Sequence, residues 1–263
     1  MSECRFSQKQ TEQIVDQILT IAYDLLVAGS EVGRTEQQIS RMCQAYGMEE
    51  VEVFIITSSI LVSVTNADGS HYTQSKRIRT YHTDFYRIEL LEHLCSYICK
   101  HTPSKEAILV YRDRISETVK MEHRWKGTGF TYGNFCIISM VFTWFFGGSF
   151  FDGIASFLCG FFIKHTLTRL ERNVSNRFVC NVISSLAGGF TAWIFYKIGL
   201  ANAIDKVIIG NIMLLIPGLA TVNAFKDLVS GEMISGLLRL ADALIQAIAI
   251  AIGFALILLP MGG

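Results

Sequence analysis

The sequence predicts an α+β cytoplasmic domain followed by an α-helical transmembrane bundle of about five spans. Of the 263 residues, 51% are hydrophobic and only 17% charged, and the mean hydropathy of +0.37 is too high for an ordinary soluble domain. Charge is unevenly distributed: the chain has 23 basic and 23 acidic side chains, and 32 of them precede Gly127. Long apolar runs follow. We therefore place a soluble domain at residues 1–126 and a membrane domain at residues 127–263.

Two helices are expected at the start of the soluble domain. Apolar residues recur at helical spacing from Ile14 to Leu25. A second helix is predicted from about Gly33 to Tyr46, where Gly47 provides a stop signal.

A small sheet is predicted next. Residues 51–57 and 60–65 are rich in β-branched side chains, and the second run leads into the turn-forming sequence 66–69, Asn-Ala-Asp-Gly. The alternating residues 77–81 predict a third strand.

Two further helices complete the predicted α+β domain. Asp84 is a suitable N-cap for a helix that extends to about Lys100. Thr102-Pro103 then offers a cap and a first-turn proline for another helix, through about Lys120.

The membrane domain begins with a nearly continuous apolar run from 130 to 163, which has the length of two spans with a turn at Gly147-Gly148-Ser149 or Asp152. Three more spans are predicted at residues 178–198, 203–222 and 234–258. The fourth of the five contains Pro217-Gly218, which would break a helix near its middle.

Basic residues in the short loops predict the orientation of the spans. They cluster before the first span and after the second, which places both of these loops in the cytoplasm. Residues 1–20 are polar and contain no apolar core of a signal peptide, in agreement with a cytoplasmic N-terminal domain. Five spans would then leave Gly263 outside. The loop residues concerned are Lys120, Arg124, Lys126, Lys164, Arg169, Arg172 and Arg177.

Several kinds of chemistry find no support in the sequence. The seven cysteines and six histidines have no metal-ligand spacing, and nucleotide-binding, zinc-protease and serine-elbow motifs are absent. We therefore expect no cofactor, no metal, no catalytic residues and no nucleic-acid partner. We interpret the cysteines as reduced structural residues.

The helix break is the predicted substrate site. A proline at the start of a half-helix leaves free amide groups suited to a carboxylate. Pro217 and Gly218 would shape this cradle, with Asn211, Thr221 and Asn223 as its lining. Asp227 would bind an ammonium group or carry a proton. The alternative is that Pro217-Gly218 is a packing kink and Asp227 caps an interfacial helix.

A second polar group lies near the start of the last span. Asp242 follows Arg239 by three residues and precedes Gln246 by four, so all three share one helix face. Arg239 and Asp242 form either an ion pair that anchors the helix or, with Asp227, a proton-coupling group.

Two blocks of sequence carry a resemblance to a known family. The first is Ala28-Gly29-Ser30-Glu31-Val32 with Arg34 and Glu36. The second runs from Gly210 through Pro217-Gly218 and includes Thr221 to Leu228, Ser230-Gly231-Glu232, Ser235-Gly236-Leu237 and Arg239. Together they resemble the signature of the threonine/serine exporter family, over nearly the whole chain.

The resemblance implies a secondary exporter of the cytoplasmic (inner) membrane that moves threonine or serine outward, in the family by proton coupling. It also implies a split, two-chain version, in which this chain resembles the larger subunit and a smaller membrane subunit supplies the second half. Separately, an odd number of spans would let a similar half inserted the other way form the inverted pair found in many transporters, and an even number would not.

The substrate and the class of function are not fixed by the resemblance. Split members resembling this chain are linked to organic-acid export, so a succinate-like dicarboxylate is a second substrate class, and both classes are small carboxylate-bearing solutes. A membrane-tethered hydrolase and a structural or assembly subunit are two further classes of function that the sequence leaves open.

Overall fold

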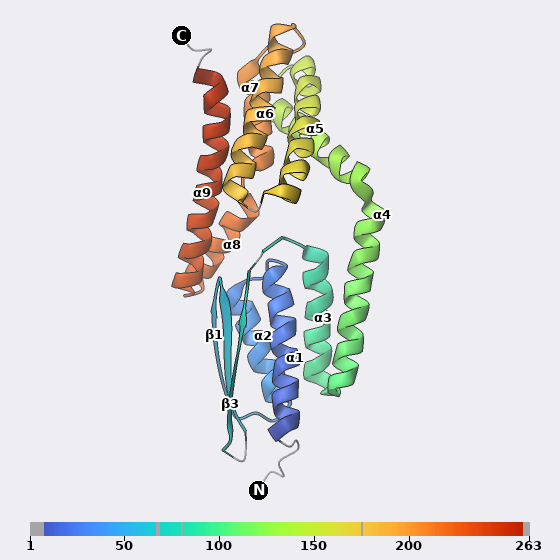
Figure 1. Cartoon of the computed structure of the whole chain (residues 1–263), viewed down its shortest axis with the longest axis vertical. Coiled ribbons are helices and arrows are strands. Elements are labelled where there is room, and N and C mark those ends of the chain that lie inside the picture. Colours follow the sequence, from blue (N-terminus) through green and yellow to red (C-terminus); the bar gives the residue numbers. More distant parts are fainter. Residues whose placement is uncertain (1–7, 67–68, 80, 175, 260–263) are drawn as a thin grey trace. The chain divides into compact units, whose positions relative to one another are not determined.

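The computed structural model describes residues 8–66, 69–79, 81–174 and 176–259 (Figure 1). The chain forms two compact units. One comprises Met1–Arg124 together with Val222–Arg239, and the other comprises Trp125–Thr221 together with Leu240–Gly263. A segment that the sequence assigns to the membrane domain thus packs in the same unit as the predicted soluble domain.

The first unit begins with two helices, α1 (Gln8–Val27) and α2 (Val32–Ala45), in agreement with the sequence. The apolar stripe of α1 is fully buried, and Gly47, with φ of +85°, follows the end of α2 in the left-handed region that favours glycine.

An antiparallel sheet follows, with the strand order β1 (Glu50–Ile56), β2 (Ser59–Thr65) and β3 (His71–Arg77). The third strand lies before the predicted residues 77–81. It pairs with β2 in register from Thr65 opposite His71 to Ser59 opposite Arg77, so the hairpin begins directly after the turn near Asn66. Residues 67, 68 and 80 of the predicted turn and strand lie outside the described residues.

Helix α3 (Phe85–His101) starts as predicted, because the Asp84 carboxylate accepts a hydrogen bond from the amide of Arg87 at 3.0 Å. The predicted cap of the next helix is wrong. Thr102 is the left-handed C-cap of α3, with φ of +43°, and α4 (Lys105–Phe145) begins two residues after Pro103. Helix α4 is interrupted at Gly127, whose φ of +50° is not helical, so it covers both the predicted helix before this residue and the first predicted span after it.

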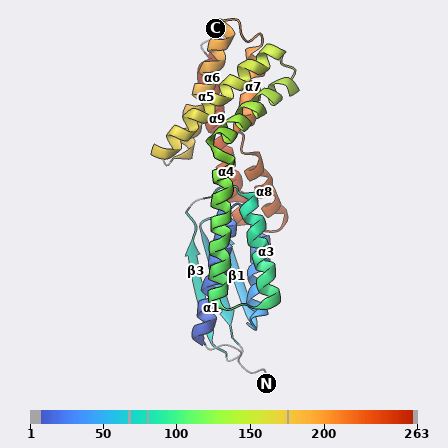
Figure 2. The same ribbon diagram turned by 90° about the vertical axis from the view of Figure 1, so that its right-hand side faces the viewer.

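The elements of residues 8–124 form three layers: the sheet, then α1 and α2, then α3 with the first part of α4 (Figures 1 and 2). The inward side chains of β2 meet those of α1 and α2 in one apolar core. The opposite face of the sheet is exposed. Burial of this core gives residues 8–124 their own source of stability.

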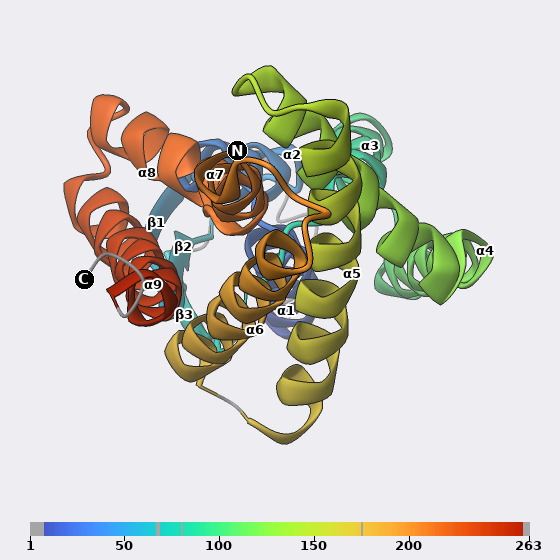
Figure 3. The ribbon, with the colours of Figure 1, turned by 90° about the horizontal axis from the view of Figure 1, so that it is seen from above.

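In the second unit α5 (Phe150–Asn173), α6 (Arg177–Lys197) and α7 (Ile204–Leu215) pack against one another (Figure 3). Small residues allow this approach. A Cβ atom added to Gly188 would lie 2.6 Å from Ile163 Cδ1, and one added to Gly253 would lie 2.6 Å from the carbonyl oxygen of Val182.

Asp152 fixes one end of this helix group. Its side chain accepts hydrogen bonds from the amide and hydroxyl of Ser149 in a capping box at the start of α5. The same carboxylate accepts from the amides of Asn202 and Ala203, at 2.6 and 2.9 Å. It therefore ties the α6–α7 connection to the start of α5.

Among the described residues three helices are long and apolar enough to cross a membrane: α5, α6 and α9 (Met233–Leu258). Helix α7 and α8 (Gly218–Val229) add a fourth span if counted together, bent by 51° at the predicted break. The predicted count of five spans also includes the last part of α4. This part is not among the helices above, because polar residues such as Thr131 and Asn134 lower its mean hydropathy. The predicted outer position of Gly263 lies outside the described residues.

Candidate functional site

The segment Val222–Arg239, which we call the α8–α9 segment, joins the end of α8 to the start of α9 through a tight turn. Gly231 adopts φ of +95°, and the amide of Glu232 donates to the carbonyl of Asp227 at 2.9 Å. The two helices approach closely at Gly236, where an added Cβ atom would lie 2.9 Å from the amide nitrogen of Leu228.

A buried ion pair holds the two helices of this segment together. Asp227 is 1% exposed, and its Oδ2 lies 2.9 Å from Nη1 of Arg239. The same Arg239 donates to the carbonyl oxygen of Ser30 at 3.2 Å, and its guanidinium lies 5.9 Å from the centre of the Tyr81 ring. Arg239 therefore links both helices of the segment to residues 8–124, which we call the α+β core.

Asp227 also completes the start of α2. The N-cap residue Glu31 makes no capping hydrogen bond with its own side chain. Instead the amide of Val32 donates to Oδ1 of Asp227 at 3.2 Å. A carboxylate at this position stabilises the positive end of the helix dipole and satisfies an amide that has no partner within the helix.

Further contacts extend the junction between the α8–α9 segment and the α+β core. Asn223 donates to the carbonyl of Gly29 at 3.3 Å, and the buried Ser235 hydroxyl donates to the carbonyl of Ile55 at 3.1 Å. Lys226 pairs with Glu31 at 2.7 Å, but both side chains are partly exposed, so this pair contributes little.

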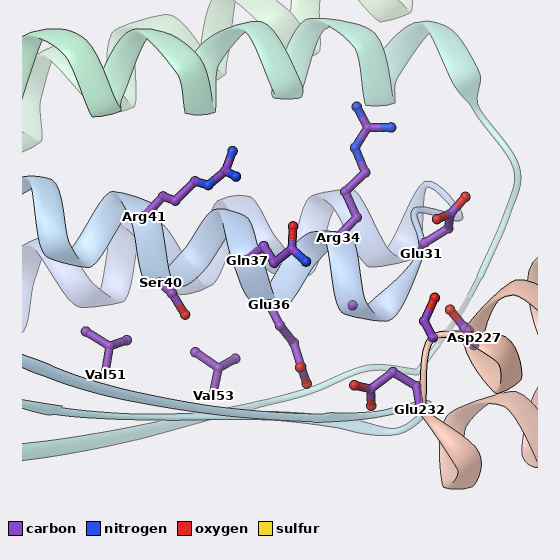
Figure 4. Close-up of a pocket in the computed structure, with 12 residues that line it drawn as sticks. Glu31, Arg34, Glu36, Gln37, Ser40, Arg41, Val51, Val53, Asp227 and Glu232 are labelled. Carbon is purple, nitrogen blue, oxygen red and sulfur yellow. The ribbon is translucent and has the colours of Figure 1, made fainter.

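A cavity of about 850 Å³ opens beside this junction, between α2, β1 and the turn of the α8–α9 segment (Figure 4). The side chains of Glu36 and Glu232 extend toward each other across it. Its lining comprises Glu31, Gly33, Arg34, Glu36, Gln37, Ser40, Arg41, Val51, Val53, Asp227, Ser230 and Glu232.

Burial, followed by repulsion from Glu232, raises the pKa of Glu36 to about 7. A hydrogen bond from the amide of Ile55 to Oε1 of Glu36, at 3.1 Å, acts in the opposite direction but is the weaker influence. Glu36 is therefore a group in the α+β unit that changes charge close to neutral pH.

The second unit contains a polar cluster that is closed on itself. Asn211 is fully buried on α7; its Oδ1 accepts from Ser139 at 2.7 Å, and its Nδ2 donates to Ser156 and to the carbonyl of Val207. Thr143 donates to Ser156 at 2.7 Å. These bonds join α4, α5 and α7, and they use both N–H donors of the Asn211 amide.

The predicted cradle residues thus fall into two groups. The second unit, which we call the membrane unit, contains Asn211, Pro217, Gly218 and Thr221. The Thr221 hydroxyl donates to the carbonyl of Pro217 at 2.9 Å. An added Cβ atom on Gly218 would meet no atom within 4 Å, so the break leaves open space beside the start of α8. Asn223 and Asp227 belong to the other unit and contact the α+β core.

The last-span residues also separate. Arg239 pairs with Asp227 and not with Asp242, whereas Asp242 accepts from Gln246 at 2.7 Å on an exposed face of α9. No group of three or more histidine, cysteine and acidic side chains within the described residues has the arrangement of a metal site.

Sequence reasoning finds most of these residues but misses what they contact. The two blocks that carry the family resemblance, around Gly29–Val32 and Asn223–Arg239, meet at this junction. The proximity of Glu36 to Glu232 is also missed, although each lies within one of the blocks. The signal that could have indicated this proximity is that Glu36 and Glu232 both belong to the sequence blocks that carry the family resemblance.

The apolar helices, with one of them broken at Pro217, define the class: this is a multi-pass membrane protein. The family model of ThrE, "Putative threonine/serine exporter", matches residues 16–259. The chain belongs to the threonine/serine exporter family, which consists of transporters and not of enzymes.

The chain is also similar to a "Probable threonine/serine exporter" of Mycobacterium tuberculosis, with 24% identity over 244 residues. The matched region is 92% of this chain and 45% of that relative, so the chain spans less than half of the relative's length. No solved structure matches the chain.

Proposed function

We propose that the chain is a subunit of a secondary active exporter that moves a small amino acid, threonine or serine, out across the cytoplasmic membrane. The observation that carries this proposal is the helix pair α7–α8, bent by 51° at Pro217, in a chain of the exporter family. Broken helices in transporters provide backbone groups that bind the solute.

The substrate cradle that we propose is the start of α8. The amides of its first turn follow Pro217, and Gly218 leaves space beside them. The Thr221 hydroxyl on the next turn donates to the carbonyl of Pro217, so its oxygen can accept a hydrogen bond from the ammonium group of the solute. Asn211 supports this site indirectly, because it holds α7 against α4 and α5. Asn223, Asp227 and Arg239 act at the junction with the α+β core.

A second, smaller membrane subunit would supply the other transporter half. The resemblance to split, two-chain exporters supports this part of the proposal. With the last part of α4 as a fifth span, beside α5, α6, α7–α8 and α9, two halves of opposite orientation would form the inverted pair common among secondary transporters.

The proposed orientation places the α+β core in the cytoplasm, where the basic residues of the short loops also lie. Energy for export would come from the proton gradient. The exposed Asp242 is the candidate proton carrier, and Asp227 is the alternative carrier if its contacts at the junction do not fix its role.

A dicarboxylate is the alternative substrate. Lys226 and Arg239 are the basic residues that follow Pro217 in the sequence, and both already have acidic partners, Glu31 and Asp227. Because their charge is neutralised, the contacts favour a solute with one carboxylate and an ammonium group. Lys226→Gln should then reduce threonine and succinate efflux by the same factor. A selective loss of succinate efflux would favour the dicarboxylate.

The decisive experiment is efflux of preloaded threonine, serine and succinate from vesicles that contain this chain, with and without its candidate partner, across an imposed proton gradient. Gradient-dependent efflux of threonine or serine only when both chains are present is the expected result. No efflux from a verified, intact complex would contradict the proposed function and favour a structural or assembly role.

A further inference from the structure

We propose that Glu36 and Glu232 form a proton-sensitive contact that controls how firmly the α8–α9 segment is held against the α+β core. The two carboxyl groups come from α2 and from the turn that starts α9, and they face each other at the cavity (Figure 4). The effect of this contact on export rests on the proposed function, whereas the pH dependence of the contact itself does not.

The surroundings leave this carboxyl pair without a cation. Among the described residues, Lys226 pairs with Glu31, Arg239 with Asp227, and Arg34 with Glu92. Figure 4 shows Arg34 and Arg41 extending from α2 on the side away from Glu36. The side chains of β1 that line the cavity are Val51 and Val53, which carry no charge. Glu31 and Asp227 are the other acidic groups at the cavity.

The protonation state of Glu36 therefore decides whether Glu36 and Glu232 repel each other. When Glu36 is neutral, it keeps its hydrogen bond from the Ile55 amide and does not repel Glu232. When Glu36 is ionised, two negative groups face each other in a partly buried cavity. The carbonyl of the same Ile55 holds Ser235 of the α8–α9 segment, so repulsion acts directly beside a contact that holds the segment.

The direction of the pH effect follows from linkage. Burial, followed by repulsion from Glu232, raises the pKa of Glu36, and the α8–α9 segment supplies Glu232 and part of the cavity lining, so the docked state binds more protons than a released one. Docking is then strongest below the pKa of the released state and weakens as the pH rises through about 7. A single carboxyl group with this pKa weakens docking by at most about tenfold between pH 6 and pH 8.

This contact would connect the pH on the side of the α+β core to the helix that follows the proposed substrate cradle. The α8–α9 segment continues α8 from the break at Pro217 and forms the start of α9. Acidification on this side would hold the segment in place, and alkalinisation would release it. The cavity gives water, and therefore protons, access to Glu36.

The test is amide hydrogen exchange of residues 227–236 in the full chain in lipid nanodiscs, expressed as protection factors at pH 6, 7 and 8. The wild-type protection factor should fall severalfold, up to about tenfold, as the pH rises. Glu36→Gln should remain protected at every pH, because the amide side chain preserves the shape and cannot ionise. Glu232→Gln should show a smaller fall.

Glu52→Gln is the matched control, because Glu52 lies on the same strand as Val51 and Val53 but is exposed and does not line the cavity. It should behave as the wild type. Protection that does not change with pH in the wild type, or that falls equally in Glu36→Gln, would overturn the inference. Because hydrogen exchange needs no transport, pH-dependent protection in a chain without efflux would contradict only the proposed function.

Discussion

The amide of Val32 donates a hydrogen bond to the Asp227 carboxylate, although 195 residues separate the two in the chain. Asp227 thus acts as the side-chain cap that α2 does not obtain from Glu31. Its other oxygen pairs with Arg239, at the start of α9. One carboxylate therefore connects α2, α8 and α9, and any movement of α8 at this point must break a buried ion pair or a helix cap.

Asp227→Asn should destabilise this junction by on the order of 3 kcal/mol, because Arg239 would be left buried without its counterion. The amide oxygen of asparagine could still accept from Val32, so the loss reports mainly the ion pair. The apparent Tm in detergent and hydrogen exchange of residues 227–236 would measure it.

Lys226→Gln is the matched control, since it breaks a neighbouring ion pair of the same segment that is largely exposed. It should cost less than about 1 kcal/mol. If Asp227→Asn left stability and exchange unchanged but abolished efflux, Asp227 would act on the solute or proton directly, and its assignment to the junction would be wrong.

The helices of the α+β core could be predicted from the sequence because each one has a local signal. The apolar spacing of α1, the Asp84 cap and Gly47 all act within a few residues of their own position. The third strand is misplaced by the sequence because alternation at 77–81 competes with pairing to β2, and pairing depends on the hairpin turn and not on the strand's own pattern.

The contacts of Asp227 could not be predicted, because they join residues nearly 200 positions apart. From sequence, Asp227 follows a broken apolar helix and resembles a binding group at membrane depth. A local pattern cannot distinguish a carboxylate that binds a solute from one that caps a distant helix, since both are buried and both accept hydrogen bonds.

Gly210→Ala should destabilise the membrane unit. A Cβ atom at this position would lie 2.9 Å from the amide nitrogen of Thr143 and 3.0 Å from the carbonyl oxygen of Ser139, so α7 must move away from α4. Overpacking of this kind costs about 1–3 kcal/mol. The apparent Tm in detergent should fall accordingly.

Gly218→Ala is the control in the same broken span, because its added Cβ atom would meet nothing within 4 Å. Its stability should be unchanged or slightly higher, since alanine favours a helix. Its efflux should nevertheless fall if the start of α8 binds the solute. Equal stability and equal efflux would remove Gly218 from the proposed cradle.

Asp152→Ala should loosen the connection between α6 and α7. The substitution removes the capping box at Ser149 and leaves the amides of Asn202 and Ala203 without their acceptor. We expect a loss of roughly 2 kcal/mol and faster hydrogen exchange of residues 199–205. Asp205→Ala removes a neighbouring carboxylate that is mostly exposed, and it should change neither measurement appreciably.

The two classes of buried serine in the membrane unit should respond in opposite ways to the same substitution. The Ser156 hydroxyl exchanges hydrogen bonds with Ser139, Thr143 and Asn211, so Ser156→Ala should cost about 1–3 kcal/mol. The Ser184 hydroxyl is equally buried but has no hydrogen-bond partner within the described part of the chain. Ser184→Ala should therefore leave stability unchanged or raise it, because it removes a polar group that is buried without compensation. Thermal unfolding of both variants in one detergent gives the comparison. Unchanged stability in Ser156→Ala would show that the closed cluster around Asn211 does not hold α4, α5 and α7 together, and a loss in Ser184→Ala as large as that expected for Ser156→Ala would show that the Ser184 hydroxyl is not buried without compensation.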